Sequence, residues 1–130
     1  MSEHYVVTFA DVMIAHEVAL IYGDGVPGVS NEAFIHSAIG RPYHELHGLI
    51  PYPTPVAKAG CLLHGLMTCH GFNDGNKRTA WLVCSGFLSM EGINLLPPDG
   101  WYDQLAVMVK DHWTVEQVIK WVGKHAEVQE

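Results

Sequence analysis

The chain has 130 residues, of which 48% are hydrophobic and 16% are charged. This length allows one domain, taken as residues 1–130, and the apolar composition excludes a disordered or coiled-coil protein. The 7 Lys and Arg residues against 14 Asp and Glu residues give a net charge of −7, which excludes the broad cationic surface that nucleic-acid binding needs.

The first half of the chain predicts two helices and a loop. Thr8 can cap a first helix that ends at Gly23, because glycine accepts the left-handed conformation that closes a helix. Ser30 can cap a second helix from Asn31 to Ile39. Residues 41–55 contain Pro42, Pro51, Pro53 and Pro55, so they are expected to form an irregular loop or a short hairpin flap.

Two apolar helices are expected in the middle of the chain. The first runs from Val56 to about Cys69, and the second runs from about Asn76 to Met90. The second helix is apolar nearly all round, which is typical of a central buried helix.

The C-terminal part predicts two amphipathic helices. Asp99 can cap one of them, whose apolar positions repeat every three or four residues at Tyr102, Leu105, Ala106 and Val109. Thr114 and Gln117 have the spacing of a capping box and begin the other. The plausible strands are Tyr5–Val7 and Asn94–Leu96, so the predicted class is all-α with six helices.

No stretch of the chain predicts a membrane span or a signal peptide. The uncharged stretches at 59–73 and 79–90 are shorter than the ~18 apolar residues that a spanning helix needs. We therefore expect a cytoplasmic protein with neither a membrane nor a nucleic-acid partner. The three cysteines are expected to be reduced thiols that form neither a disulfide nor a zinc site; they are Cys61, Cys69 and Cys84.

Residues 70–80, HGFNDGNKRTA, have a composition unlike the rest of the chain. Gly71 and Gly75 allow backbone angles that side chains forbid and let a ligand approach closely. The N–H groups that open the next helix point toward one place and favour an anion there. Lys77 and Arg78 add full positive charges, so the segment predicts a local phosphate site.

Three further side chains of this segment suggest chemistry. Asp74 offers the hard oxygen ligand that Mg²⁺ prefers when it also binds phosphates. His70 can accept a proton at neutral pH and is the natural general base. Phe72 lies between polar neighbours and is expected to anchor the loop in the core, which holds His70 and Asp74 rigidly.

This segment resembles the active-site motif of Fic-fold proteins, and more narrowly the HxFxDxNKRTA motif of their Doc (death-on-curing) branch. Weaker similarities extend the resemblance to about residues 16–92; they lie at Tyr22-Gly23, Gly28, residues 37–42, Phe87-Leu88 and Gly92. The C-terminal helices match mainly in pattern.

The resemblance implies a compact six-helix Fic fold with a central buried helix and a small flap. It also implies that His70 deprotonates a hydroxyl of a target protein, that Asp74 holds Mg²⁺ on ATP, and that Gly75, Asn76, Lys77 and Arg78 bind the phosphates. Doc-type toxins resemble kinases that phosphorylate a threonine of elongation factor Tu and stop translation. A Phd-type antitoxin is the implied partner, acting in trans, because the sequence shows no inhibitory helix of its own.

Two positions depart from the pattern of family members that transfer AMP. Lys77 stands where those enzymes have a second glycine, and Trp81 stands where they have a closing arginine. Moving a cation by one helical turn can decide which phosphorus faces the hydroxyl, so phosphoryl transfer is the favoured expectation. The alternatives are an adenylyl- or other nucleotidyl-transferase that modifies a protein hydroxyl, and a non-catalytic Fic-like binding module.

Other histidines and aromatic residues have simpler interpretations. His64 is expected to be a structural core residue. His44 and His47 lack the HExxH spacing of a zinc site, and their loop is expected to be the flap that pairs with an extended target segment. Three tryptophans either belong to the core or form a groove for a partner helix; they are Trp101, Trp113 and Trp121.

Overall fold

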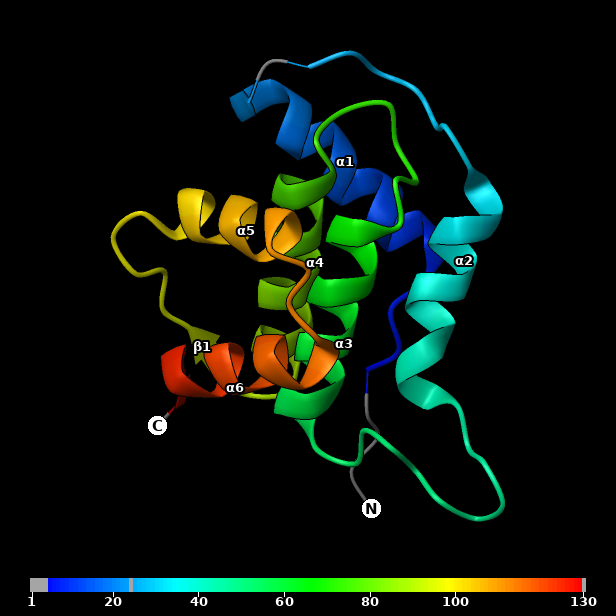
Figure 1. Ribbon diagram of the computed structural model, residues 1–130, viewed down its shortest axis with the longest axis vertical. Coiled ribbons are helices and arrows are strands. Elements are labelled where there is room, and N and C mark those ends of the chain that lie inside the picture. Colours follow the sequence, from blue (N-terminus) through cyan, green and yellow to red (C-terminus); the bar gives the residue numbers. More distant parts are fainter. Residues whose placement is uncertain (1–4, 24, 130) are drawn as a thin grey trace.

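The computed structural model describes residues 5–23 and 25–129, which form six α-helices, a short 3-10 turn and a two-stranded sheet (Figure 1). The helices are α1 (Phe9–Gly23), α2 (Glu32–Gly40), α3 (Pro55–Thr68), α4 (Asn76–Met90), α5 (Trp101–Lys110) and α6 (Val115–His125). The turn η1 (Arg41–Tyr43) follows α2. The predicted all-α class is confirmed. Within the described residues, no helix is long and apolar enough to cross a membrane.

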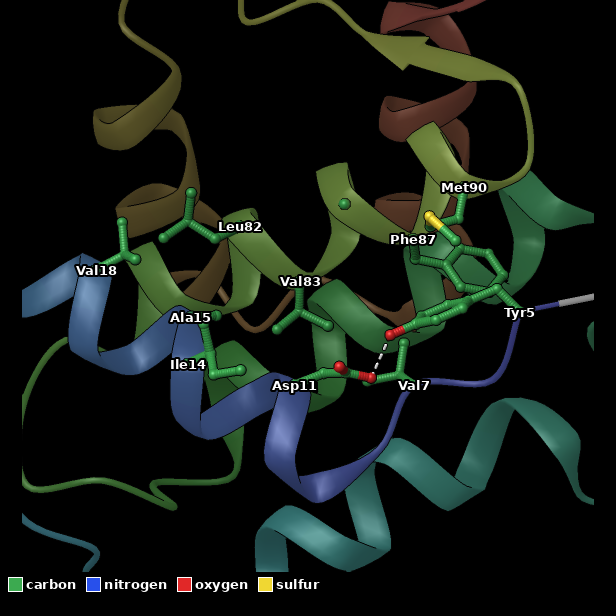
Figure 2. A pocket seen from close by; sticks show the side chains of 11 residues that line it. Tyr5, Val7, Asp11, Ile14, Ala15, Val18, Leu82, Val83, Phe87 and Met90 are labelled. Carbon is green, nitrogen blue, oxygen red and sulfur yellow. Dashed lines mark hydrogen bonds between the residues drawn. The ribbon is translucent and has the colours of Figure 1, made fainter.

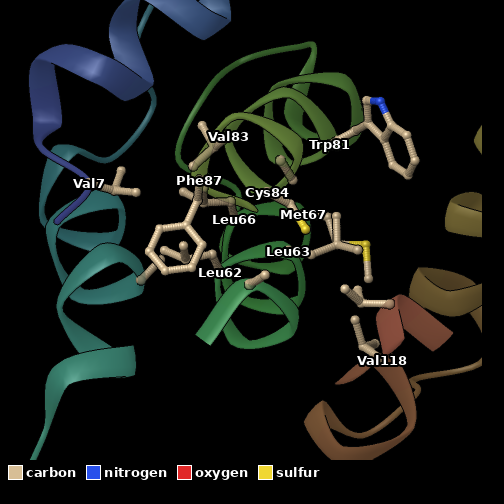
Figure 3. Packing of buried hydrophobic residues seen from close by; sticks show 14 of the residues in the cluster. Val7, Leu62, Leu63, Leu66, Met67, Trp81, Val83, Cys84, Phe87 and Val118 are labelled. Atoms are coloured by element: carbon tan, nitrogen blue, oxygen red, sulfur yellow. The ribbon is translucent and has the colours of Figure 1, made fainter. Parts of the chain in front are cut away.

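Helices α3 and α4 form the centre of the molecule. Helices α1 and α2 lie on one side of this pair, and α5 and α6 lie on the other (Figure 1). Apolar side chains of the central pair fill the space between Val7 on one side and Val118 on the other (Figure 3). Each fully buried Leu or Phe there contributes roughly 1.5–3 kcal/mol, so the core fixes the two helix ends that the loop at residues 69–75 connects.

Two of the predicted helix caps are confirmed. The Asp11 N–H donates to Thr8 Oγ1 at 3.2 Å, and the Thr8 N–H donates to the Asp11 carboxylate at 2.9 Å. At the start of α6, Thr114 and Gln117 form the reciprocal bonds of a capping box. Both pairs satisfy backbone donors that a helix start leaves unpaired.

The other two predicted caps are wrong. Asn31 and not Ser30 caps α2, since its side-chain oxygen accepts from the Phe34 N–H at 3.2 Å. Helix α5 begins after Gly100, whose φ of +74° is left-handed, and no side chain caps it. Gly100 occupies the N-cap position, so Asp99 lies one residue too early to cap the helix.

One of the two predicted strands is wrong. Strand β1 (Ile93–Leu95) pairs antiparallel with β2 (Ala126–Val128), which follows α6 directly. Residues 5–7 are not a strand; Val7 is buried in the core instead. The strand expected at 94–96 is present one residue earlier, at 93–95.

The segment between α2 and α3 is the expected irregular loop, apart from the 3-10 turn at its start. Residues 44–54 contain a tight turn in which Leu46 and Leu49 exchange backbone hydrogen bonds of 2.9 Å. The loop lies at the first residue of α3, whereas residues 69–75 follow its last (Figure 1). Because α3 has 14 residues, about 20 Å separates its two ends.

An apolar groove of about 370 Å³ lies between α1 and α4 (Figure 2). Its polar groups include the Tyr5 hydroxyl and the Asp11 carboxylate, and the hydroxyl donates to the carboxylate. This bond raises the pKa of Tyr5 to about 12 and lowers that of Asp11. None of residues 70–78 lines the groove, so it is separate from the motif segment.

Candidate active site

The motif loop between α3 and α4 is braced by the segment that follows α1. The N–H groups of Ser30 and Asn31 both donate to the Gly71 carbonyl, at 2.8 and 3.0 Å. Val29 and Phe72 form an isolated antiparallel bridge. These contacts join residues forty or more positions apart, so the loop is held by a second segment of the chain.

The two glycines of the motif have different roles. Gly75 precedes the first residue of α4 and has a left-handed φ of +78°. It therefore uses the backbone freedom that was expected of it. Gly71 is not among the residues with a positive φ. A Cβ at Gly71 would collide with the Ile35 side chain, so close packing and not an unusual backbone angle explains this glycine.

Phe72 is buried, as expected, and is held from two sides. Its ring stacks on the His16 imidazole of α1, with 3.7 Å between ring centroids and 9° between planes. The Asn76 amide accepts from the Phe72 N–H at 3.1 Å and donates to the Phe72 carbonyl at 3.0 Å. His16 Nε2 also donates to the Asp74 carbonyl at 2.9 Å. The position of the loop is therefore fixed before any ligand binds.

Backbone donors orient the Asp74 carboxylate, and its two oxygens can still accept further interactions. One oxygen accepts from the Gly75 N–H at 3.0 Å, and the other accepts from the Val26 N–H at 3.3 Å. Each carboxylate oxygen can accept a second interaction, and the side chain is exposed. In the described part of the chain no cluster of three or more His, Cys, Asp or Glu side chains is placed to hold a metal. Mg²⁺ commonly takes one or two carboxylates together with phosphate oxygens, and the role of Asp74 as a ligand of such an ion remains a prediction.

His70 follows α3 with a left-handed φ of +53° and an exposed side chain. It lines a cavity of about 360 Å³ between α2 and α3; the other lining residues are Phe34, Ser37, Ala38, Arg41, Gly65, Thr68 and Cys69. Burial raises the pKa of the Cys69 thiol, so this neighbour stays protonated and is a poor nucleophile. An imidazole is the side chain that exchanges protons near neutral pH, and His70 is therefore the candidate base of this cavity.

Lys77 and Arg78 lie in the first turn of α4, which no side chain caps. Cations are disfavoured at this end of a helix because the helix dipole is positive there. The Lys77 Nζ lies 5.8 Å and the Arg78 Cζ 4.7 Å from the centroid of the Tyr102 ring on α5. Two cations at a positive helix end are a local cost to stability that an anionic ligand would offset.

The other two predicted phosphate ligands are partly engaged within the loop. The Gly75 N–H donates to Asp74, and one N–H of the Asn76 amide donates to the Phe72 carbonyl. An amide nitrogen carries two N–H donors, so Asn76 retains one for a ligand. The phosphate-binding roles of Gly75, Asn76, Lys77 and Arg78 remain predictions.

Sequence reasoning missed three residues that surround the motif. His16 belongs to the buried face of α1 and is only 4% exposed, so its polar role was hidden within an apolar pattern. Val26 contributes a backbone N–H, for which a sequence carries no signal. Tyr102 was expected on the buried face of its helix, but it is 37% exposed and lies beside the two cations.

His64 is structural, as expected. Its Nε2 donates to the Trp113 carbonyl at 3.1 Å, and its Nδ1 lies 3.4 Å from an Arg41 nitrogen. Burial, together with the Arg41 charge, lowers the pKa of His64. Both effects favour the neutral imidazole.

The loop that carries His44 and His47 lines a different cavity from His70. This second cavity contains Arg41, His44, Glu45, Leu46, Pro51 and Tyr52, so the two cavities share Arg41. The loop lies at the far end of α3 from His70 (Figure 1). Its role as a flap for a target segment remains a prediction.

The three tryptophans do not line one common groove. Trp101 stacks on Trp81 with 4.7 Å between centroids, and Trp121 meets Trp81 edge-on at 6.1 Å. Trp113 and Trp121 do line a cavity together with Gln117, Lys120 and Lys124, but Trp101 does not. Trp101 packs against the core instead.

Comparisons with known proteins give a family match and a similar toxin. Residues 5–88 match the Fic/DOC family. The chain is 35% identical over 85 residues to the protein named Toxin Doc of Mycolicibacterium smegmatis, a match that covers 65% of this chain and 63% of that protein. The match therefore spans less than two thirds of the relative's length. The matched residues 5–88 include the whole segment 70–80, while α5 and α6 lie outside them.

Proposed function

This chain belongs to the Fic/DOC family, and on that premise we propose that it is a Doc-like toxin kinase. It transfers the γ-phosphoryl group of ATP to a Thr or Ser hydroxyl of a translation factor, elongation factor Tu, and so arrests translation. The observation that carries this proposal is the braced loop with the helix start that follows it, which together present His70, Asp74 and two cations from the nine consecutive positions 70–78. Preorganised groups of this kind are the main source of catalysis in phosphoryl transfer.

In the proposed reaction His70 acts as the general base. The target hydroxyl oxygen forms a bond to the γ-phosphorus, and the bond from that phosphorus to the bridging β–γ oxygen breaks. ADP leaves, and the hydroxyl proton ends on His70. The cavity between α2 and α3, which His70 lines, would admit the acceptor side chain.

Lys77 and Arg78 would hold the phosphates, supported by the remaining N–H of Asn76 and the start of α4. A cation about 4 Å from a phosphate oxygen contributes on the order of 4 kcal/mol at an effective dielectric near 20. Asp74 would hold Mg²⁺, which neutralises phosphate charge when it is bound. Backbone donors from Gly75 and Val26 keep this carboxylate oriented.

Phosphoryl transfer is favoured over AMP transfer by the environment of Trp81. This residue stands where AMP-transferring relatives are expected to have an arginine, and it is 8% exposed and stacked on Trp101. No cation can act from that position. Adenylyl transfer is the second candidate, and it is separated from the first by which phosphate reaches the product.

The test is incubation of the protein with elongation factor Tu, Mg²⁺ and ATP labelled on either the α- or the γ-phosphate. We expect label from the γ-phosphate alone. The His70→Ala variant should lose roughly 10²–10⁴-fold in rate, as expected for removal of a general base. His47→Ala is the matched control, because His47 has the same left-handed backbone (φ +52° against +53°) and lies in the other loop.

Other outcomes would replace the proposal. Label from the α-phosphate indicates an adenylyltransferase on the same site. Absence of label from both positions, with full growth of a bacterial host that expresses the protein, indicates a binding module. Growth arrest that His70→Ala relieves, and that a co-expressed Phd-type antitoxin also relieves, supports the toxin and its proposed partner.

A further inference from the structure

Lys77 and Arg78 share one aromatic partner, the Tyr102 ring of α5. The Arg78 guanidinium carbon lies 4.7 Å and the Lys77 ammonium 5.8 Å from the centroid of the Tyr102 ring. Within residues 5–23 and 25–129, neither cation has a carboxylate within ion-pair distance. A cation within about 6 Å of an aromatic face is attracted by the ring quadrupole, so Tyr102 is the group that orients both.

Tyr102 is itself held by a row of aromatic rings. Trp101 meets it edge-on with 5.7 Å between centroids, and Trp101 stacks on Trp81 of α4 at 4.7 Å. Both ends of this row lie beside α4. Trp81 belongs to α4, one turn after Lys77, and Tyr102 lies beside the cations of its first turn. The ring of Tyr102 therefore has a fixed place relative to the first turn of α4, although it is partly exposed.

The Arg78 side chain is also confined by Gly23, the last residue of α1. A Cβ at Gly23 would lie 2.5 Å from Arg78 Nε and 3.0 Å from its Cδ. The arginine side chain thus passes directly over the Gly23 backbone on its way to the Tyr102 ring. Two separate elements, α1 and α5, limit the rotamers of one side chain.

We propose that Tyr102 is a positioning residue that holds Lys77 and Arg78 ready for the phosphates of ATP. This inference rests on the proposed function. Long cationic side chains lose conformational entropy when a ligand immobilises them, and orientation in advance reduces that loss. Tyr102 lies outside the family-matched residues 5–88, so it is a feature of the C-terminal helices of this chain.

The test measures binding of Mg²⁺·ATP by calorimetry in the His70→Ala background, which prevents turnover. Tyr102→Leu should weaken binding on the order of fivefold, as expected for loss of two partly exposed cation–π contacts. Tyr102→Phe keeps the ring face and should bind within about twofold of the parent. In an Arg78→Ala background the effect of Tyr102→Leu should shrink, because one of the oriented cations is gone.

The outcomes separate this inference from the proposed function. If the parent binds Mg²⁺·ATP and Tyr102→Leu binds equally well, the positioning role is wrong while the kinase proposal stands. If Tyr102→Phe is as weak as Tyr102→Leu, loss of the hydroxyl or of the fold explains the effect, and the positioning role is again wrong. A parent that does not bind Mg²⁺·ATP removes the proposed function and this inference together.

Discussion

The loops at the two ends of α3 contain similar residues but differ in how they are held. Residues 44–54 and 69–75 both include an exposed histidine with a left-handed backbone, at His47 and His70. The 69–75 loop receives hydrogen bonds from α1, from the 25–31 segment and from Asn76. In the 44–54 loop the two leucines of the turn bond to each other, and they are 64% and 70% exposed.

This difference shows which feature marks a candidate site. An exposed histidine with a left-handed backbone occurs in both loops. A left-handed non-glycine residue is uncommon, but it is not in itself evidence of function. Only the 69–75 loop combines them with bracing by distant segments. Such bracing fixes reactive groups before a ligand arrives, which catalysis requires.

The largest difference between the loops should appear when one apolar side chain is truncated in each. Phe72→Ala removes a buried ring that stacks on His16, and we expect it to lower the free energy of unfolding by about 3–5 kcal/mol. Leu46→Ala removes an exposed side chain and should change it by less than about 0.5 kcal/mol. Urea unfolding of both variants checks this, and equal losses would mean that the 69–75 loop is not anchored by Phe72.

A smaller loss is expected from the amide that bonds to both backbone groups of Phe72. Asn76→Ala leaves that N–H and carbonyl without their partners, at an expected cost of about 2–3 kcal/mol. His44→Ala, in the other loop, is the comparison and should stay within about 0.5 kcal/mol of the wild type. Thermal unfolding with matched buffers measures both; a neutral Asn76→Ala would show that the amide bonds contribute nothing net.

Two glycines with positive φ give a third comparison: Gly28 in the segment that braces the 69–75 loop, and Gly48 within the 44–54 loop. Gly28 has a φ of +116°, and a Cβ there would lie 2.7 Å from Asn73 Nδ2. Gly48 has a φ of +80°, and a Cβ there would meet no atom within 4 Å. We expect Gly28→Ala to cost about 2 kcal/mol and Gly48→Ala about 1 kcal/mol. The reverse order of unfolding midpoints would contradict the close approach of the 25–31 segment.

The smallest expected effect lies in α3, which joins the two loops, and depends on pH. The pKa of His64 is lowered in the folded protein by burial and by Arg41, so the unfolded chain binds more protons when the pH falls below about 6.5. The free energy of unfolding should therefore decrease as the pH falls through this range. His64→Gln should make that decrease smaller in urea unfolding at pH 7.5 and 5.5. An identical pH dependence in both proteins would exclude His64 as the source.

The helices could be predicted because their signals are local. Gly23, the proline-rich stretch after α2 and the Thr114 capping box each mark a helix end within a few residues. The location of the candidate site could be predicted for the same reason, since His70 to Arg78 are consecutive positions at the junction of α3 and α4.

The missed features depend on contacts between distant positions. Ser30 and Asn31 are both good cap residues, and a sequence cannot tell which one caps α2. In the structure, the N–H groups of both donate to Gly71 while the Asn31 side chain turns toward Phe34. Tyr102 fits an apolar helical stripe, but its face is set by Lys77 and Arg78, twenty-four or more positions earlier.

The double acceptance at the Gly71 carbonyl has a consequence for solution measurements. The amide protons of Ser30 and Asn31 are held by the motif loop and not by a helix of their own, so their exchange with solvent water requires the two segments to separate. Their exchange rates therefore report on the assembly of the loop in the intact protein, without any nucleotide or target. Heavy-water exchange followed residue by residue would make positions 30 and 31 an internal gauge of how often the site opens.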